Sequence, residues 1–246
     1  MLEWQTGRIV DIQQASPSTK RFFIELPSIK NFEFESGQFV TLDLPIHEQK
    51  NKRWRSYSIA SAPNGTNIFE LVIVLLEGGA GTNYLFNEVT VGCELTLRGP
   101  AGKFTLPETI DKDLYFICTG TGIAPFRSMV QHIKNNKITA RNIYLVFGCR
   151  VFGDCLYKDE LLALQEEMPN FHYMPCFSRE EDVPHCGRKG YVHEAYTEAI
   201  NANRINGELS PASFYLCGWK NMIDDAKHRI VELGYDKKAI HLELYG

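Results

Sequence analysis

The pattern of hydrophobic residues changes near residue 107, and this change limits the possible folds more than any other feature of the sequence. Before it, segments rich in Val, Ile, Phe and Thr alternate with clusters of Gly, Pro, Asn and Ser, such as residues 62–67. Short β-type segments at close spacing favour an antiparallel barrel. We predict strands at residues 8–13, 20–26, 38–44 and 69–76, and one helix at residues 82–89.

After residue 107, strand-like and helix-like segments alternate along the chain. This alternation predicts a parallel sheet wound with helices. The strands are expected at residues 114–118, 142–147, 171–177 and 213–217, and the helices at 125–134, 156–168, 195–200 and 221–233. With 246 residues the chain is long enough for two domains. The predicted division is into residues 1–108 and 109–246.

Composition argues against several classes of function. The net charge of −4 and the isoelectric point near 6.0 disfavour general binding to nucleic acid or to anionic membranes. The first residues do not resemble a signal peptide, and no apolar run approaches the roughly 20 residues that span a bilayer. We therefore expect a cytoplasmic protein. Its seven cysteines fit neither a zinc site nor the plant-type iron–sulfur spacing, so no metal is predicted.

Residues 55–61 carry the first motif with chemical meaning, Arg-Ser-Tyr-Ser-Ile-Ala-Ser. The Arg55 guanidinium can pair with a phosphate, the Tyr57 ring can stack on a planar cofactor, and the Ser58 hydroxyl can bond to a ring atom. Taken alone, the same residues fit a β-strand with a surface arginine and a core tyrosine.

Two glycine-rich turns follow this motif, and each leads into a predicted helix. Residues 78–82 form the first, and backbone N–H groups at such a helix start bind anions. Residues 118–128 form the second, in a strand–turn–helix order that is typical of a dinucleotide phosphate site. The first turn, taken alone, also fits a flexible hairpin loop. In the second turn, Gly-Thr-Gly by itself would be weak evidence for a dinucleotide site, but the whole eleven-residue string is strong evidence.

With these motifs the sequence resembles the ferredoxin–NADP reductase family of flavin-dependent reductases. The resemblance implies an N-terminal antiparallel six-stranded FAD-binding β-barrel followed by a C-terminal parallel-sheet α/β domain for NADP(H). Eight matching pieces follow the family's order over essentially the whole chain, at residues 55–58, 81–85, 99–103, 120–128, 156–160, 178–180, 217–222 and 243–245.

The resemblance also implies which residues contact FAD. Arg55 would hold the pyrophosphate, Tyr57 would stack on the flavin ring, and Ser58 would lie beside its reactive N5 atom. The expected FAD contacts are Arg55, Ser56, Tyr57, Ser58, Val72, Ile73, Val74, Ala80, Gly81, Thr82, Thr121 and Tyr245. Two positions depart from the plant members, which carry a lysine at the place of Val74 and end on the aromatic residue, whereas here Gly246 follows Tyr245.

A second set of residues is implied for the nicotinamide nucleotide. Ser178, Arg179, Lys189 and Tyr191 offer the donors, cations and ring that a 2′-phosphate requires, which favours NADP(H) over NAD. Glu180–Asp182 follow directly, so a solvated charged loop is the alternative interpretation, and a Gly-Tyr-Val stretch shared with NADH-dependent oxygenase reductases leaves NAD open. The expected NADP contacts are Gly120, Thr121, Gly122, Ser178, Arg179, Lys189, Tyr191, Cys217 and Gly218.

The function implied is hydride exchange with NADP(H) and single-electron exchange with a small protein carrier, ferredoxin or flavodoxin. The expected catalytic residues are Ser58, Cys217 and Glu243, and the other six cysteines are expected to be inert. The basic run that contains Lys50, Lys52 and Arg53 would attract an acidic carrier, although an ordinary solvated loop fits it equally well.

Three alternatives remain open from the sequence. The first is the NAD(P)H-dependent reductase component of an oxygenase, and the second is a free-flavin reductase. A third, non-enzymatic alternative is a flavin-binding electron-transfer subunit without turnover of pyridine nucleotide.

Overall fold

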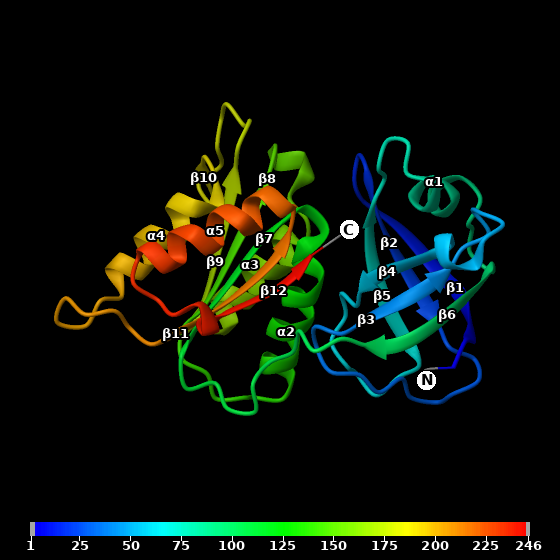
Figure 1. Cartoon of the computed structure of the whole chain (residues 1–246), viewed down its shortest axis with the longest axis horizontal. Helices are drawn as coiled ribbons and strands as arrows, with labels where there is room; N and C mark the ends of the chain where they lie inside the picture. Colours follow the sequence, from blue (N-terminus) through cyan, green and yellow to red (C-terminus); the bar gives the residue numbers. More distant parts are fainter. Residues whose placement is uncertain (1–2, 245–246) are drawn as a thin grey trace. The chain divides into compact units, whose positions relative to one another are not determined.

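The computed structural model describes residues 3–244, which form two compact units. Of these residues, the first unit contains 3–106 and 124–132, and the second contains 107–123 and 133–244 (Figure 1). The segment 124–132 is packed with the first unit although it follows the first strand of the second unit in the sequence.

The first unit is a six-stranded antiparallel sheet in the order β4-β3-β6-β1-β2-β5. A bridge between Ile59 and Leu71, and a hydrogen bond of 2.8 Å from Ala60 N to Glu70 O, join the segment that follows β4 to the middle of β5 and close the barrel. The strands are β1 (Gln5–Ser16), β2 (Thr19–Glu25), β3 (Phe39–Asp43), β4 (Trp54–Ser58), β5 (Ile68–Val74) and β6 (Glu94–Ala101).

Side chains that alternate along these strands fill the barrel interior. Ile24, Val40, Leu42, Leu71 and Leu97 are among its fully buried members. Helix α1 (Ala80–Asn87) follows β5 and adds Leu85 to the same core, and the short helix η1 (Lys50–Lys52) precedes β4.

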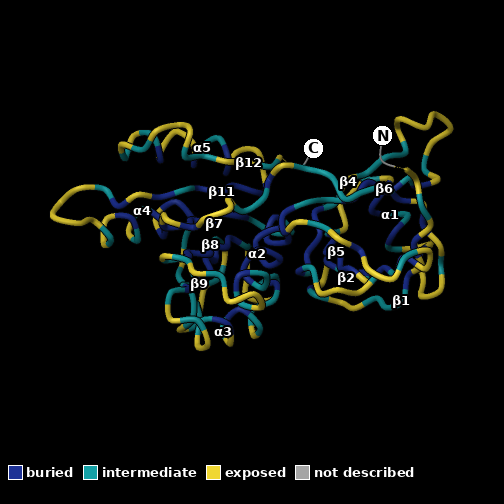
Figure 2. The backbone as a smooth tube through the Cα atoms, turned by 90° about the horizontal axis from the view of Figure 1, so that it is seen from below, coloured by how far each residue is buried: buried dark blue, intermediate teal, exposed yellow. Residues whose placement is uncertain are grey.

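The second unit is a six-stranded parallel sheet in the order β10-β9-β8-β7-β11-β12. Helices α4 and α5 cover one face and α3 covers the other (Figure 2). The strands are β7 (Asp113–Thr119), β8 (Ile143–Cys149), β9 (Phe171–Phe177), β10 (Arg188–Lys189), β11 (Ala212–Gly218) and β12 (Ile240–Leu244). The helices are η2 (Gly120–Ile123), α2 (Ala124–Asn135), η3 (Phe152–Asp154), α3 (Lys158–Glu167), α4 (Val192–Ala202), α5 (Lys220–Glu232) and η4 (Lys237–Ala239).

The predicted fold class, an antiparallel barrel followed by a parallel α/β unit, is confirmed. In the second unit the strand order reverses at β7, because β8, β9 and β10 extend the sheet to one side and β11 and β12 to the other. Ligands of open α/β sheets bind at such a reversal, outside the carboxyl ends of the strands. The chain segments that leave β7 and β11 are therefore the first place to look for a nucleotide site.

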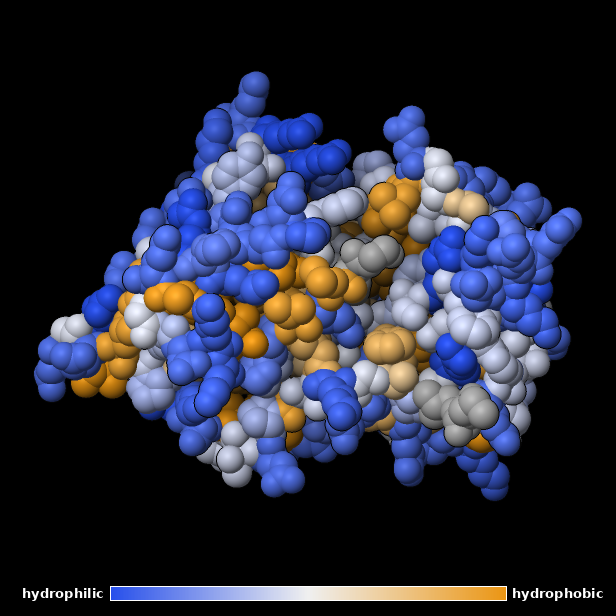
Figure 3. All heavy atoms as spheres, viewed as in Figure 1, coloured by the Kyte–Doolittle hydropathy of each residue, from blue (hydrophilic) through white to orange (hydrophobic). Residues whose placement is uncertain are grey.

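Strand β12 is an outer strand of this sheet and exposes Leu242 and Leu244. The space-filling view shows hydrophobic side chains gathered on this face of the molecule over the region of β12 (Figure 3). None of the helices between residues 3 and 244 is long and apolar enough to cross a membrane.

Candidate functional site

In the first unit, Arg55 lies against the first turn of helix α1. Its Nη1 atom donates to the carbonyl oxygens of Lys52 and Trp54, at 3.0 and 2.8 Å, which holds the guanidinium in place. A Cβ atom on Gly81 would lie 3.1 Å from Arg55 Cγ and 3.3 Å from Nε, so the glycine permits this close approach. The first N–H groups of a helix lack partners within the helix and attract anions. Together with the guanidinium they form a cradle that fits a pyrophosphate.

The Thr82 hydroxyl has a structural role in the turn before α1. It accepts a hydrogen bond from Leu76 N at 3.1 Å and lies 3.1 Å from Gly79 O. The Asn83 amide also donates to Gly79 O, at 2.9 Å. These bonds fix the turn, so it is the backbone of residues 80–82 rather than the Thr82 hydroxyl that faces an anion.

Side chains along β4 alternate between the two faces of the sheet. Tyr57 packs against the barrel core. Burial raises the pKa of its phenol to about 12, and the Arg55 charge has a smaller effect in the opposite direction. Ser58 is also buried. Ser56 points to the other face, where its hydroxyl lies 3.0 Å from the hydroxyl of Thr41. The structure therefore does not bring the Ser56 side chain together with Arg55 and Tyr57.

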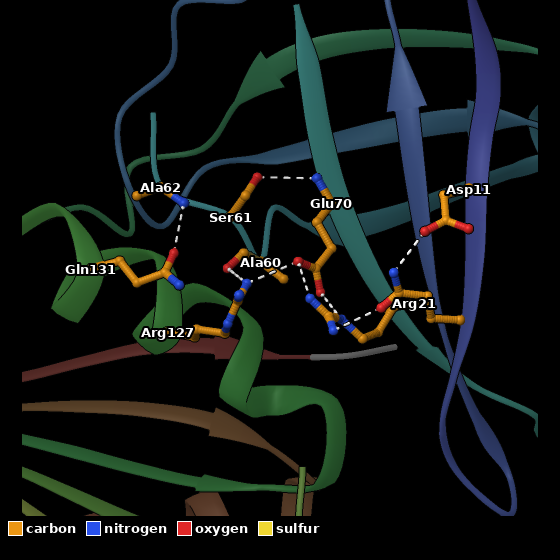
Figure 4. Close-up of polar contacts among 9 residues, drawn as sticks. Asp11, Arg21, Ala60, Ser61, Ala62, Glu70, Arg127 and Gln131 are labelled. Atoms are coloured by element: carbon orange, nitrogen blue, oxygen red, sulfur yellow. Dashed lines mark hydrogen bonds and ion pairs between the residues drawn. The ribbon is translucent and has the colours of Figure 1, made fainter. Parts of the chain in front are cut away.

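A buried ionic network lies next to this motif, and the sequence analysis did not identify it (Figure 4). The Glu70 carboxylate in β5 accepts two hydrogen bonds from Arg21, at 2.6 and 3.0 Å, and one from Arg127 Nη1 at 3.0 Å. Arg127 Nη1 also donates to Ala60 O at 2.9 Å, two residues after Ser58. Arg127 belongs to α2, so the network fixes this helix to the segment that follows β4.

Neighbouring side chains of α2 strengthen the same attachment. The Ser128 hydroxyl donates to Ser61 O at 2.7 Å, and Gln131 Oε1 accepts from Ala62 N at 3.2 Å. Arg127 and Ser128 end the glycine-turn motif of residues 118–128, which the sequence analysis linked to phosphate binding. In the structure both side chains bind protein groups of the first unit.

In the second unit, the segments that leave β7 and β11 are packed tightly together. A Cβ atom on Gly122 would lie 2.4 Å from the carbonyl oxygen of Cys217, and one on Gly218 would lie 2.4 Å from Thr119 Oγ1. The Trp219 backbone N–H donates to Thr119 Oγ1 at 3.2 Å. A side chain at either glycine would collide with the facing segment, so both positions require glycine. The predicted dinucleotide turn therefore lies at the point where the strand order reverses.

Two expected catalytic residues are neighbours in this sheet. Cys217 in β11 is aligned with Glu243 in β12 and with Cys118 in β7. Cys217 and Cys118 are both fully buried. Burial raises the pKa of the Cys118 thiol well above its ordinary value, with a smaller contribution from Cys217. Residue Tyr245, expected to contact the flavin, lies outside the described residues.

The residues expected at a 2′-phosphate lie near one edge of the sheet, at the outer strand β10 and its neighbour β9. Ser178 follows β9, and its backbone N–H donates to Cys149 O at 3.0 Å. Lys189 in β10 pairs with Phe177, the residue before Ser178. Tyr191 begins helix α4 with 65% of its surface exposed. Glu180 accepts a hydrogen bond of 2.7 Å from Phe152 N, so this acid is bound within the loop.

The positive side chains of the basic run before β4 differ in their exposure and in their partners. Lys50 and Lys52 in η1 are exposed. Arg53 instead pairs with Asp43, with 2.7 Å between Nε and Oδ1, and also bonds to Leu44 O at 3.2 Å. The charge of Arg53 is therefore partly neutralised by the barrel itself. Within residues 3–244, no group of three or more His, Cys, Asp or Glu side chains is placed to hold a metal ion.

Comparison with known proteins identifies two domains in this chain. Residues 6–106 match the oxidoreductase FAD-binding domain, and residues 116–228 match the oxidoreductase NAD-binding domain. Ferredoxin–NADP reductase B of Sorangium cellulosum is 35% identical over 244 residues, which cover 97% of this chain and 96% of that protein. The chain belongs to the ferredoxin–NADP reductase family. It is accordingly a flavoenzyme oxidoreductase that uses FAD and a nicotinamide dinucleotide.

Some relatives are longer than this chain. The phenol hydroxylase P5 protein of Acinetobacter pittii is 32% identical over 239 residues, but the chain spans only 64% of its length. The crystal structure of a ferredoxin–NADP⁺ reductase from Neisseria gonorrhoeae with bound FAD and NADP matches the fold with a TM-score of 0.81. That match covers all of both chains at 24% sequence identity.

Proposed function

We propose that this family member exchanges a hydride with NADP(H) and single electrons with a small protein carrier, ferredoxin or flavodoxin. FAD, when bound, supplies the conversion between one two-electron step and two one-electron steps. Residues 1–108 would bind FAD, and residues 109–246 would bind NADP(H). The observation that carries the proposal is the tight contact of Gly122 with Cys217 at the reversal of the strand order, which joins a phosphate turn to an expected catalytic residue.

The residues proposed to bind FAD contact different parts of the cofactor. Arg55 and the backbone of residues 80–82 bind the pyrophosphate, and Tyr57 supplies a ring face. Ser58 orients the flavin ring by a hydrogen bond, and the main chain of Val72–Val74 lies along it. Ser56 contributes through its backbone, since its hydroxyl is bonded to Thr41.

The residues proposed to bind NADP(H) likewise contact different parts of the nucleotide. The turn of Gly120, Thr121 and Gly122 binds the pyrophosphate, with Gly218 beside it. Cys217 and Glu243 orient the nicotinamide end. At the outer strands, Ser178, Arg179 and Lys189 bind the 2′-phosphate and Tyr191 stacks on the adenine.

A comparison of NADPH with NADH tests the nucleotide assignment. Stopped-flow reduction of the bound flavin should be faster with NADPH, and Arg179→Ala should remove about 1.5–3 kcal/mol of NADPH binding while sparing NADH. Arg204→Ala is the matched control, because Arg204 is an exposed arginine of the same unit that bonds to Gly207 O at 3.0 Å. Equal loss of both activities in Arg179→Ala would refute the 2′-phosphate assignment.

Reversal of charge on the basic run tests the carrier proposal. Lys50→Glu combined with Lys52→Glu should slow reduction of an acidic ferredoxin at low salt and leave ferricyanide reduction unchanged. Lys30→Glu is the control, since Lys30 is also an exposed lysine of the first unit. Equal slowing with both acceptors would argue against docking at this run.

The relatives favour one alternative, a reductase that serves an oxygenase. Several are named as such components, including the anthranilate 1,2-dioxygenase electron transfer component of Acinetobacter baylyi, which is 32% identical over 201 residues. This chain spans 54% of that protein. An NADH-dependent oxygenase reductase would reduce its flavin faster with NADH, whereas the proposed enzyme would do so with NADPH.

A further inference from the structure

Two cysteines and a tyrosine meet where strand β8 ends in the second unit. Cys149 is the last residue of β8, and Cys155 lies between η3 and α3. The Cys155 sulfur lies 3.2 Å from the hydroxyl of Tyr173, in the neighbouring strand β9. The side chains of Cys149 and Cys155 share a hydrogen bond, and Cys149 Sγ also lies 3.5 Å from Val151 O.

These two thiols are more exposed than three other cysteines of the chain. Cys118, Cys176 and Cys217 are fully buried in the sheet, where a dissolved reagent does not reach them. Cys149 and Cys155 are only half-buried. They lie on either side of a five-residue loop, so the contact between them does not depend on the packing of distant segments.

The surroundings of the pair make its members chemically unequal. The hydrogen bond from Cys149 lowers the pKa of Cys155, and Tyr173 and the Lys158 ammonium add to this effect. Burial and Asp159 oppose it. The same shared hydrogen bond raises the pKa of Cys149, together with burial and the charges of Cys155, Asp154 and Cys176. Cys155 is thus the more acidic thiol of the pair and Cys149 the less acidic one, a division that favours Cys155 as the attacking group in disulfide exchange.

We propose that Cys149 and Cys155 form a thiol–disulfide exchange site that reacts with low-molecular-weight disulfides of the glutathione disulfide class. The Cys155 thiolate attacks one sulfur of the disulfide, forms a mixed disulfide and releases one thiolate. Cys149 then loses its proton and attacks the Cys155 sulfur, which closes the protein disulfide and releases the second thiolate. Two protein thiols are oxidised, and one small disulfide is reduced to two thiols.

Incubation of the flavin-loaded protein with glutathione disulfide tests this proposal by mass spectrometry. We expect the protein to lose two hydrogen atoms and to yield one disulfide between the peptides that contain Cys149 and Cys155. In Cys149→Ser a glutathione adduct should accumulate on Cys155, and in Cys155→Ser neither product should form. Cys186→Ser, the control at another half-buried cysteine of the same unit, should react like the wild type.

Two results would overturn the proposal. One is adduct formation at Cys93 or Cys186 at the rate seen for Cys155. The other is unchanged reaction at Cys149 in the Cys155→Ser protein, which would assign the nucleophile to the wrong residue.

The Tyr173→Phe variant separates chemistry from structure, because it keeps the ring and removes only the hydroxyl. Loss of that hydrogen bond should shift the pH–rate profile of exchange to higher pH and slow the reaction several-fold at neutral pH. The groups around Cys155 that also titrate or carry charge are Cys149, Lys158, Asp159 and Asp154. A profile identical to that of the wild type would contradict the assignment of Cys155 as the thiolate stabilised by Tyr173.

Discussion

The Nη1 atom of Arg127 lies 3.0 Å from Oε2 of Glu70, and only 7% and 3% of the two side chains are exposed. Arg21 binds the same carboxylate from the other side, at 2.6 Å. One buried acid therefore holds two arginines, one in the barrel strand β2 and one in helix α2 (Figure 4). Removal of the acid takes the opposite charge from Arg127, whose side chain is only 7% exposed, and from Arg21, which is 25% exposed.

We expect Glu70→Gln to destabilise the protein strongly. Loss of one member of a buried ion pair costs about 3–5 kcal/mol, because the remaining charge stays desolvated. Arg127→Met should cost a similar amount, since the buried Glu70 carboxylate would lose one of its two arginines. Urea unfolding followed by far-UV circular dichroism measures both changes in the free energy of unfolding.

Glu25→Gln is the matched control for the Glu70 prediction. Glu25 pairs with Arg8 at 2.6 Å in the same barrel, but 52% of the Arg8 side chain is exposed. An exposed pair contributes about 0–1 kcal/mol. Equal destabilisation by the two glutamate variants would show that the buried network has no special role.

Much of the fold was predictable because its hydrophobic pattern is locally consistent. Each helix predicted after residue 107 corresponds to one in the structure. Hydrophobic residues repeat about every 3.6 residues in a helix and every two in a strand, so the two kinds of segment can be told apart in the sequence. Strand β6 was not predicted, because Gly99 and Pro100 within it are typical of turns. Strand β12 was not predicted either, since three of its five residues are exposed at an outer position of the sheet.

The site was predictable only where a motif is continuous in the sequence. The Glu70–Arg127 contact joins residues 57 positions apart, and no local pattern connects them. One signal was present, a single acid within the apolar run of residues 68–74, since a buried charge needs a partner. The pairing of Arg53 with Asp43 likewise depends on the register of β3 and β4, which the sequence alone does not specify.

Gly122→Ala should impair nucleotide binding while sparing the flavin. Its Cβ would lie 2.4 Å from Cys217 O and 2.7 Å from the Cys217 carbonyl carbon, so backbone must move. A misplacement of about 1 Å near the reacting groups costs on the order of 10²-fold in rate. We expect the rate of flavin reduction by NADPH to fall by roughly this factor. Absorbance at the flavin band should show unchanged FAD content.

The control for this prediction is Gly153→Ala, in the same unit. A Cβ atom at Gly153 would have no heavy atom within 4 Å, so the added methyl group finds open space. Its rate should equal that of the wild type. A Gly122→Ala protein that reduces its flavin normally would contradict the proposed role of the turn.

Stability should fall as the pH is lowered from about 7 to 5, because three histidines of the second unit have lowered pKa values. Burial is the main cause for His172, His193 and His241. A lowered pKa means that the unfolded chain takes up the proton first, below its ordinary value of 6.5. Stability is therefore complete above that value and is lost as the pH falls through it, by at most about 1.4 kcal/mol per pH unit and histidine.

Thermal unfolding at several pH values measures this effect. The His193→Gln variant should show a shallower decline of the melting temperature with acid, whatever its stability at neutral pH. The triple variant, which also carries His172→Gln and His241→Gln, should show the shallowest decline. A slope equal to that of the wild type in the triple variant would exclude these histidines as the cause.

Arg55→Ala should weaken FAD binding, because the α1 helix start would keep its N–H groups but lose the cation beside them. Charge-assisted hydrogen bonds are worth about 1.5–3 kcal/mol, so the dissociation constant should rise by about 10- to 150-fold. Arg55→Lys should rescue only part of this loss, since an ammonium lacks the planar fork. Fluorescence titration with FAD measures the affinities, and unchanged binding in Arg55→Ala would refute the cradle.

Oxidation of Cys149 and Cys155 should raise the KM for NADPH more than that for NADH, a prediction that depends on both the exchange site and the proposed 2′-phosphate site. Cys149 O accepts the hydrogen bond from Ser178 N at 3.0 Å, and Arg150 O accepts one from Arg179 N at 2.8 Å. A disulfide that closes the loop of residues 150–154 therefore acts on the backbone that positions Ser178 and Arg179.

Steady-state assays of the dithiol and disulfide forms, separated by mass before the assay, test this coupling. The Cys149→Ser protein supplies the control, because it cannot close the disulfide and should keep one KM under both conditions. If the disulfide forms but both KM values stay constant, the exchange site stands and its link to the nucleotide loop is refuted. If no disulfide forms, the exchange site itself is refuted, and the Arg179→Ala comparison still decides the 2′-phosphate assignment independently.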